Sequence, residues 1–234
     1  MVRPTKQTQH SDLKAAIIAT AWAHISTTGA AMLSLRAIAR DLQISAPAIY
    51  HYYPDRDALV TALIIESYTS LADHQFHARD TCNDGDIVAL LQAMGTAYRD
   101  WALAHPQHYQ LIFGTPLPGY DAPVAAVRPA AARSLGVLIQ IIEQARRAGR
   151  LNVAHAPILA TTHTPEFVAW QQYTGAHHLQ SLVVAQAIWG RLHGLVSLEL
   201  SCSLPLFAAT AEALYNAELA AVRWTYIRAE RVEL

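Results

Sequence analysis

The chain has 234 residues, of which 53% are apolar and only 15% are charged, so it can bury a core and is not intrinsically disordered. Its 17 basic side chains nearly balance its 18 acidic ones, which excludes a protein that coats nucleic acid through bulk charge along its whole length. The length allows one large domain, or a small domain joined to a larger one.

The cysteines and the uncharged stretches predict a cytoplasmic protein. Cys82 and Cys202 lie far apart and form no CxxC pair, as expected in a reducing compartment. The N-terminal segment lacks the continuous apolar core of a secretory signal. The longest stretch without Asp, Glu, Lys or Arg, from Phe167 to Gly190, carries several glutamine and histidine residues and is a poor membrane span.

The first helices are predicted from capping residues and apolar spacing, because no stretch alternates apolar and polar residues as a strand would. Ser11 or Asp12 caps a first helix that runs to about Thr28, and Gly29 supplies the left-handed residue that commonly ends a helix. Ser34 is the cap of a second helix, in which apolar residues recur at intervals of three and four.

A three-residue turn then separates two short helices. Gln43 to Ser45 breaks the second helix, and Ser45 is predicted to cap a third that runs from Ala46 to about Tyr53. Pro54 ends that helix, and Asp55 caps a long fourth helix. Helices are also predicted near 86–104, 106–113, 128–148, 155–174, 179–201 and 206–230, with an irregular loop at 114–123 and Gly149 closing the helix before it. The expected fold is all-α.

The first quarter of the chain has the pattern of a helix-turn-helix that reads DNA. Residues 1–60 carry six basic and four acidic side chains, whereas the rest of the chain is net acidic. Ile49 and Tyr53 are spaced to face inward, which leaves Ala46, Pro47, Ala48, Tyr50, His51 and Tyr52 outward or on the rim. Small residues let the helix approach a major groove, and the outward rings can donate to phosphates or bases. On the preceding helix, Arg36 is placed to reach bases or the DNA backbone, and Ser34 can help the helix N-terminus to bind a phosphate.

The stretch LSLRAIARDLQISAPAIYHYYPDRDALV resembles the DNA-binding signature of the TetR family of bacterial one-component repressors. The resemblance implies DNA contacts at Ser34, Arg36, Ser45, Ala46, Ala48, Tyr50, His51, Tyr52 and Arg56. The family usually has glycine at Gln43, phenylalanine at Tyr53 and lysine at Arg56, and Gln43 suggests a slightly altered turn. Plain helical packing, with the tyrosines as a hydrophobic cluster, is the alternative interpretation of the same pattern.

The resemblance also implies a DNA-binding domain over residues 1–57 and a helical domain over 58–234 that binds a small molecule and forms a homodimer. The segment WGRLHGLVSLEL, from Trp189 to Leu200, is similar to a subgroup named for its Trp, His and Gly residues. The resemblance implies a repressor that binds a palindromic DNA operator and is released by an effector, without a cofactor or an enzymatic activity.

Small residues that recur on one helical face predict the dimer interface. They let two helix backbones approach closely, and two such helices from each subunit would form a four-helix interface. The stripes comprise Gly190, Gly194, Ser197 and Ser201 on one helix and Ala209, Ala213 and Ala217 on the next. Packing of these stripes within a single subunit is the alternative.

Aromatic and histidine residues in the middle of the chain are candidates for the lining of an effector pocket. Such a pocket is mostly apolar with a few polar groups, so the effector is expected to be small and largely apolar or aromatic. The candidates are Tyr98, Trp101, His105, Phe113, Trp170, Trp189 and His193. Ordinary core packing explains any single member equally well.

Two other classes of function are kept as alternatives. Twelve histidines suggest a metal-responsive regulator, but no HExxH or CxxC spacing occurs, and the adjacent His177 and His178 diverge on a helix, so no metal site is predicted. A helical small-molecule enzyme is the second alternative, although the chain has no phosphate-binding glycine loop and no GxSxG motif.

Overall fold

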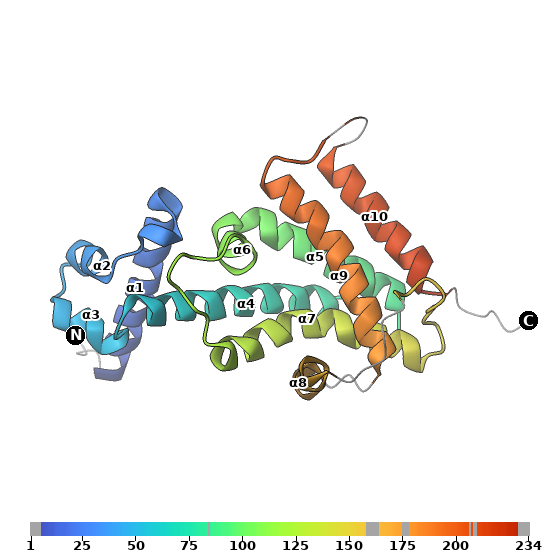
Figure 1. The fold of residues 1–234 in the computed structure, drawn as a ribbon, viewed down its shortest axis with the longest axis horizontal. Helices are drawn as coiled ribbons and strands as arrows, with labels where there is room; N and C mark the ends of the chain where they lie inside the picture. Colours follow the sequence, from blue (N-terminus) through green and yellow to red (C-terminus); the bar gives the residue numbers. More distant parts are fainter. Residues whose placement is uncertain are drawn as a thin grey trace, which may run out of the picture. The chain divides into compact units, whose positions relative to one another are not determined.

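The computed structural model describes residues 6–83, 85–157, 164–174, 178–205, 207 and 210–228 (Figure 1). These residues form helices and no strand, apart from an isolated antiparallel bridge between Leu151 and Ile227. The predicted all-α fold is therefore confirmed. The elements are α1 (Lys6–Thr28), the 3-10 turn η1 (Ala30–Met32), α2 (Leu35–Asp41), α3 (Ala46–Tyr52), α4 (Arg56–Asp80), α5 (Ile87–Ala104), α6 (Pro106–Phe113), α7 (Val124–Arg147), α8 (Pro165–Thr174), α9 (Leu179–Leu200) and α10 (Ala211–Tyr226).

The chain packs as two compact units. The first comprises Met1–Ser67 and Gln107–Val127, and the second comprises Tyr68–Pro106 and Arg128–Leu234. The division falls within α4, so this helix is covalently part of both units. The predicted boundary after residue 57 concerns function, and this division by packing does not test it.

In the first unit, α1, α2 and α3 pack against one another around a small apolar core. Ile17, Ile38 and Ile49, one from each of these helices, are completely buried. The predicted caps at Ser34 and Asp55 are confirmed, because the Ser34 hydroxyl accepts from the amide of Ala37 and the Asp55 carboxylate accepts from that of Ala58. The predicted end of α1 is also confirmed, since Gly29 has φ +80°.

In the second unit, α5, α9 and α10 pack side by side, and Figure 1 shows α9 and α10 as neighbours. At Gly95 of α5, a Cβ atom would lie 2.7 Å from a methyl group of Leu219 on α10, so a larger residue here would force the Leu219 side chain to shift. The hydroxyl of Tyr215, also on α10, donates to the Gly95 carbonyl at 2.7 Å. A bidentate ion pair between Arg99 and Glu199 joins α5 to α9.

Among the described helices, α7 alone is long and apolar enough to cross a membrane by length and composition. Its apolar residues instead supply part of the second unit's core, including Val137, Ile141 and Ile142. Arg133 and Glu143 also lie within it and pair with Asp73 and Arg146. These features are typical of a core helix.

Four predicted helix boundaries are wrong. The first helix, α1, begins at Lys6, so Ser11 and Asp12 lie inside it and neither is its cap. The helix predicted at 155–174 is α8, which begins only at Pro165, and residues 154–157 form a turn that precedes residues outside the described range. The helix predicted at 206–230 is α10, which begins after the cap Thr210. Helix α7 begins at Val124, four residues before the prediction, and continues through Pro129, which lies inside it in the second turn.

Candidate nucleic-acid interface

The turn between α2 and α3 contains a residue in the left-handed conformation. Gln43 has φ +54°, a region that side chains with a Cβ rarely adopt. The turn is closed by a hydrogen bond of 3.0 Å from the Ile44 amide to the Ala39 carbonyl. The altered turn expected at Gln43 is thus a standard left-handed turn, in which glutamine occupies a position that suits glycine.

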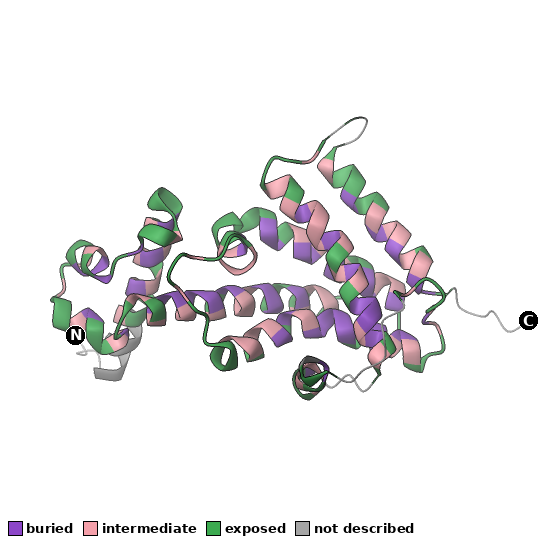
Figure 2. Ribbon diagram, viewed as in Figure 1, coloured by how far each residue is buried: buried purple, intermediate pink, exposed green. Residues whose placement is uncertain are grey.

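Helix α3 has one buried face and one exposed face, as predicted. Ile49 is completely buried and Tyr53, directly after the helix, is 4% exposed. Tyr50 is 40% exposed and His51 is exposed, so neither ring belongs to the core. Figure 2 shows the exposed residues of α3 on the outer surface of this unit. A short helix that presents small and ring-bearing residues outward can enter a major groove.

The remaining predicted DNA-binding residues also lie on the surface of the first unit. Exposed residues are Ser34, Arg36, Ser45, Ala46 and Pro47, and half-buried ones are Ala48, Tyr52 and Arg56. Ser45 is the N-cap of α3, as predicted, although its side chain makes no capping hydrogen bond. Ser34 accepts from Ala37 with its side chain, and its backbone begins α2.

Arg56 is held by the first unit itself. Its guanidinium donates to the Ala30 and Ala31 carbonyls of η1 at 3.2 and 3.3 Å, and to the carboxylate of Asp57 at 3.4 Å. These bonds connect the start of α4 to the segment between α1 and α2. The predicted contact of Arg56 with DNA stays a prediction.

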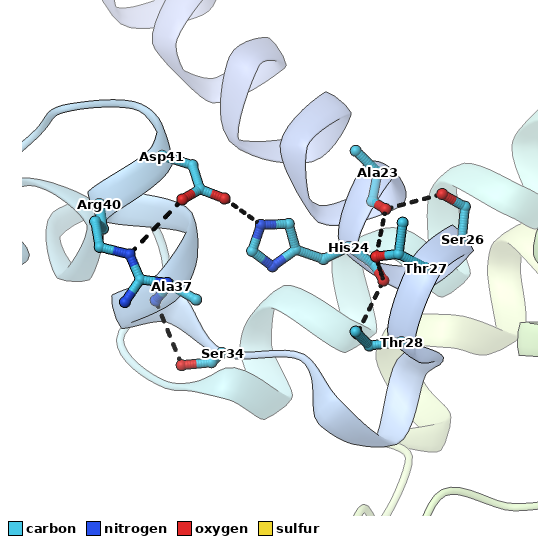
Figure 3. Close-up of polar contacts among 9 residues, drawn as sticks. All are labelled: Ala23, His24, Ser26, Thr27, Thr28, Ser34, Ala37, Arg40 and Asp41. Carbon is cyan, nitrogen blue, oxygen red and sulfur yellow. Dashed lines mark hydrogen bonds and ion pairs between the residues drawn. The ribbon is translucent and has the colours of Figure 1, made fainter.

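A polar cluster at the contact between α1 and α2 was not predicted from the sequence. His24 of α1 lies 2.6 Å from a carboxylate oxygen of Asp41, the last residue of α2, and Arg40 approaches the other oxygen at 3.8 Å (Figure 3). The two residues are seventeen positions apart. Periodicity within one helix carries no signal for such a pair, because the pairing depends on how two helices cross.

Three of the predicted effector-binding residues come together in the second unit. The Tyr98 hydroxyl lies 2.7 Å from Nδ1 of His193, and the ring of Trp189 stacks on the His193 imidazole with centroids 4.3 Å apart. Nε2 of His193 lies 3.3 Å from the Ser197 hydroxyl. Burial lowers the pKa of His193, so the imidazole is held neutral. The group joins α5 to α9 and can serve as core or as the polar wall of a pocket.

The other predicted effector-binding residues are dispersed. Trp101 is 1% exposed and donates to the Ser70 hydroxyl at 3.0 Å, with His105 exposed beside it. Trp170 lies on α8, and Phe113 belongs to the first unit, where it packs on Tyr109. An open depression in the second unit is lined by residues absent from the predicted set, namely His155, Arg191, Trp224, Thr225 and Tyr226.

The residues predicted for the dimer interface are mostly on the surface of the single chain. A Cβ atom built at Gly190 or at Gly194 would meet nothing within 4 Å. Ser201, Ala213 and Ala217 are exposed, Ser197 is half-buried against His193, and Ala209 lies outside the described residues. Across the described residues, no group of three or more His, Cys, Asp or Glu side chains is arranged to hold a metal ion.

Two family descriptions match this chain. Residues 17–63 match the model described as "Bacterial regulatory proteins, tetR family", and residues 91–222 match the one described as "Tetracyclin repressor-like, C-terminal domain". The first match contains the helix-turn-helix, and the second contains α9 and most of α10.

Individual proteins are also similar. The HTH-type transcriptional regulator Rv1816 of Mycobacterium tuberculosis is 41% identical over 118 residues, which are 49% of this chain and 49% of that protein, so the match spans about half the length of the curated relative. The crystal structure of SCO4313, described as a regulatory protein, has 32% identity and a TM-score of 0.74 over 94% of this chain and 98% of that one. A Rhodococcus sp. RHA1 protein of unknown function shares the fold, with 22% identity and a TM-score of 0.70 over 92% of this chain and 96% of that one.

Proposed function

This chain belongs to the TetR family of bacterial regulatory proteins, and from that premise we propose that it is a cytoplasmic repressor that binds a palindromic operator as a homodimer. We propose further that a small, largely apolar or aromatic effector releases it from DNA. The observation that carries the proposal is the exposure pattern of α3. Its Ile49 is completely buried, whereas its Tyr50 and His51 are exposed to solvent. A helix without a partner molecule would not need to present these rings outward.

The exposed stripes of α9 and α10 support the homodimer. Gly190 and Gly194 have open space in front of them, and Ala213 and Ala217 lie on the exposed side of the neighbouring helix. Nearby, Leu198 is 40% exposed and Leu214 is 36% exposed, although both are large apolar residues. A second copy of this surface would cover them, and its two-fold axis would place two copies of α3 on successive turns of a palindrome.

Aromatic and polar groups in the second unit support the effector. Trp189, Tyr98 and His193 combine flat apolar surfaces with a hydrogen-bonded hydroxyl and imidazole, which suits a small aromatic ligand. Such a ligand acts by binding better to one conformation of the dimer than to the other. Helix α4 carries the change toward α3, because its residues belong to both units.

Substitution of Tyr50 tests the interface on DNA. The first step is selection of bound sequences from random duplexes with the wild-type protein, followed by titration of the selected duplex. We expect Tyr50→Ala to weaken binding by at least about fivefold, since a side-chain contact to a base is worth about 1–3 kcal/mol. Tyr173→Ala is the matched control, because Tyr173 is also exposed but lies on α8. If the two variants bind the duplex with equal affinity, Tyr50 of α3 does not contact DNA.

A further inference from the structure

The segment that follows α5 returns to the unit that contains the helix-turn-helix. Residues 107–127 pack with residues 1–67, although the chain on either side of them belongs to the second unit. The contacts that hold this segment are specific. The His108 imidazole of α6 stacks on the Trp22 ring of α1, with centroids 3.7 Å apart and 21° between the planes.

The same imidazole is hydrogen-bonded to α4. Its Nδ1 lies 3.1 Å from the hydroxyl of Ser67, which also donates to the Leu63 carbonyl at 2.7 Å. Trp22 is fixed in turn, because its indole N–H donates to the carboxylate of Glu66 at 2.8 Å. His108 therefore touches α1 through its ring face and α4 through its ring nitrogen, and these are the two helices that border α2 and α3 in the chain.

A second contact lies further along the segment. The hydroxyl of Tyr120, in the loop after α6, is 2.9 Å from the hydroxyl of Thr61 on α4. The segment is thus attached to α4 at Ser67 and at Thr61, about one and a half turns apart on the helix. Attachment at two points fixes the orientation of a short segment better than a single contact does.

We propose that His108 is a positioning residue for DNA recognition: by binding Trp22 and Ser67 together, it sets the orientation of α1 relative to α4 and therefore the pose of α2 and α3. Helix α6 is joined directly to α5 and, through the loop, to α7, so the segment that carries His108 is covalently continuous with the second unit at both of its ends. The consequence at the operator rests on the function proposed above, whereas the effect on α1 to α3 does not.

The test compares the full-length His108→Ala protein with Gln107→Ala, an exposed neighbour in the first turn of α6. Amide hydrogen exchange without DNA should be about two- to tenfold faster in α1 to α3 of His108→Ala, because the loss of a stacked aromatic pair makes local opening easier. Exchange in α9 and α10 should remain at the wild-type rate. His108→Phe, which keeps a ring against Trp22 but loses the contact with Ser67, should restore only part of the protection.

Binding of a selected operator duplex supplies a second measurement, which distinguishes a positioning residue from a residue that contacts DNA. His108→Ala should weaken binding while the slope of log affinity against log salt stays as in the wild type, because no phosphate contact is lost. Arg36→Ala should reduce that slope. If the wild type binds no duplex, the proposed function fails and the exchange comparison still decides the role of His108. Equal exchange rates in α1 to α3 of His108→Ala and Gln107→Ala would overturn the proposal.

Discussion

Two residues of the helix-turn-helix depart from the TetR pattern, and each sits in a position that the usual residue would fit better. Gln43 adopts φ +54°, where glycine has no steric penalty. The hydroxyl of Tyr53, where the family usually has phenylalanine, is buried and has no hydrogen-bond partner among the described residues. Burial, together with the negative charge of Glu66, raises the pKa of Tyr53, so the hydroxyl stays neutral. Both departures are therefore expected to lower the stability of the first unit.

Gln43→Gly should stabilise the protein. Relief of the left-handed strain is worth about 1–2 kcal/mol, and the greater freedom of glycine in the unfolded chain offsets part of it, so we expect a net gain of about 0.5–1 kcal/mol. Chemical denaturation of the two proteins measures the difference. Gln43→Ala is the control, because alanine retains a Cβ and should give no gain. A Gln43→Gly protein less stable than the wild type would show that the glutamine side chain has a stabilising contact.

Tyr53→Phe should also stabilise the protein, because it removes a buried hydroxyl that has no partner. A gain of about 1 kcal/mol in the free energy of unfolding is expected from the desolvation of such a group. Tyr215→Phe provides the matched comparison: its buried hydroxyl donates to the Gly95 carbonyl at 2.7 Å, so its loss should destabilise by about 1 kcal/mol. If Tyr53→Phe lowers the unfolding midpoint, as Tyr215→Phe is expected to do, then the Tyr53 hydroxyl does have a hydrogen-bond partner.

At the scale of helices, the second unit relies on a buried carboxylate. Glu143 of α7 is 5% exposed and accepts two hydrogen bonds from Arg146 and one from Ser181 of α9. The Arg146 guanidinium, with the Ser181 hydroxyl and against the opposing effect of burial, lowers the pKa of Glu143 from 4.5 to about 2. A carboxylate with a lowered pKa stabilises the fold fully above its unfolded pKa and loses that effect as the pH falls through the folded value.

Glu143→Gln should therefore destabilise the protein at pH 7, by about 2 kcal/mol, because hydrogen bonds to a charged group and the ion pair are both weakened. The difference from the wild type should shrink as the pH falls from about 4.5 toward 2, which denaturation at a series of pH values would record. Arg147→Gln is the control, since Arg147 is 68% exposed and its Nε lies 3.5 Å from Glu143. A difference in unfolding free energy between Glu143→Gln and the wild type that does not depend on pH would contradict this role.

Local signals predicted most helices, and long-range contacts account for what they missed. Ser34, Asp55 and Gly29 marked helix ends correctly because caps and left-handed residues act within one turn. The proline in the first turns of α7 misplaced the start of that helix. The outward position of Tyr50 followed from spacing, whereas the contacts of His24 with Asp41 and of His108 with Trp22 join separate helices and have no local pattern.

At the scale of the whole molecule, the proposed function depends on a dimer, and the single chain leaves one face of α9 open to form it. The polar and aromatic group at His193 lies on the same helix as Gly190 and Gly194, so one face of α9 contacts α5 while another is open. A ligand that changes the contact of Tyr98 with His193 would therefore act on the helix that is proposed to meet the second copy. In the proposed dimer, this arrangement would connect effector binding to the spacing of the two α3 helices.

Enlarging Gly194 should separate the effect on the dimer from the effect on the fold. A Cβ atom there meets nothing within 4 Å in one chain, and leucine favours the helix more than glycine does, so the monomer should remain folded, whereas two copies would be pushed apart. We expect sedimentation to show a weaker dimer for Gly194→Leu, an intermediate effect for Gly194→Ala, and loss of binding to a palindrome but not of the weak binding to a single half-site. A Gly194→Leu protein with an unchanged dimer dissociation constant would place the interface elsewhere, because close approach at this face could not then be required.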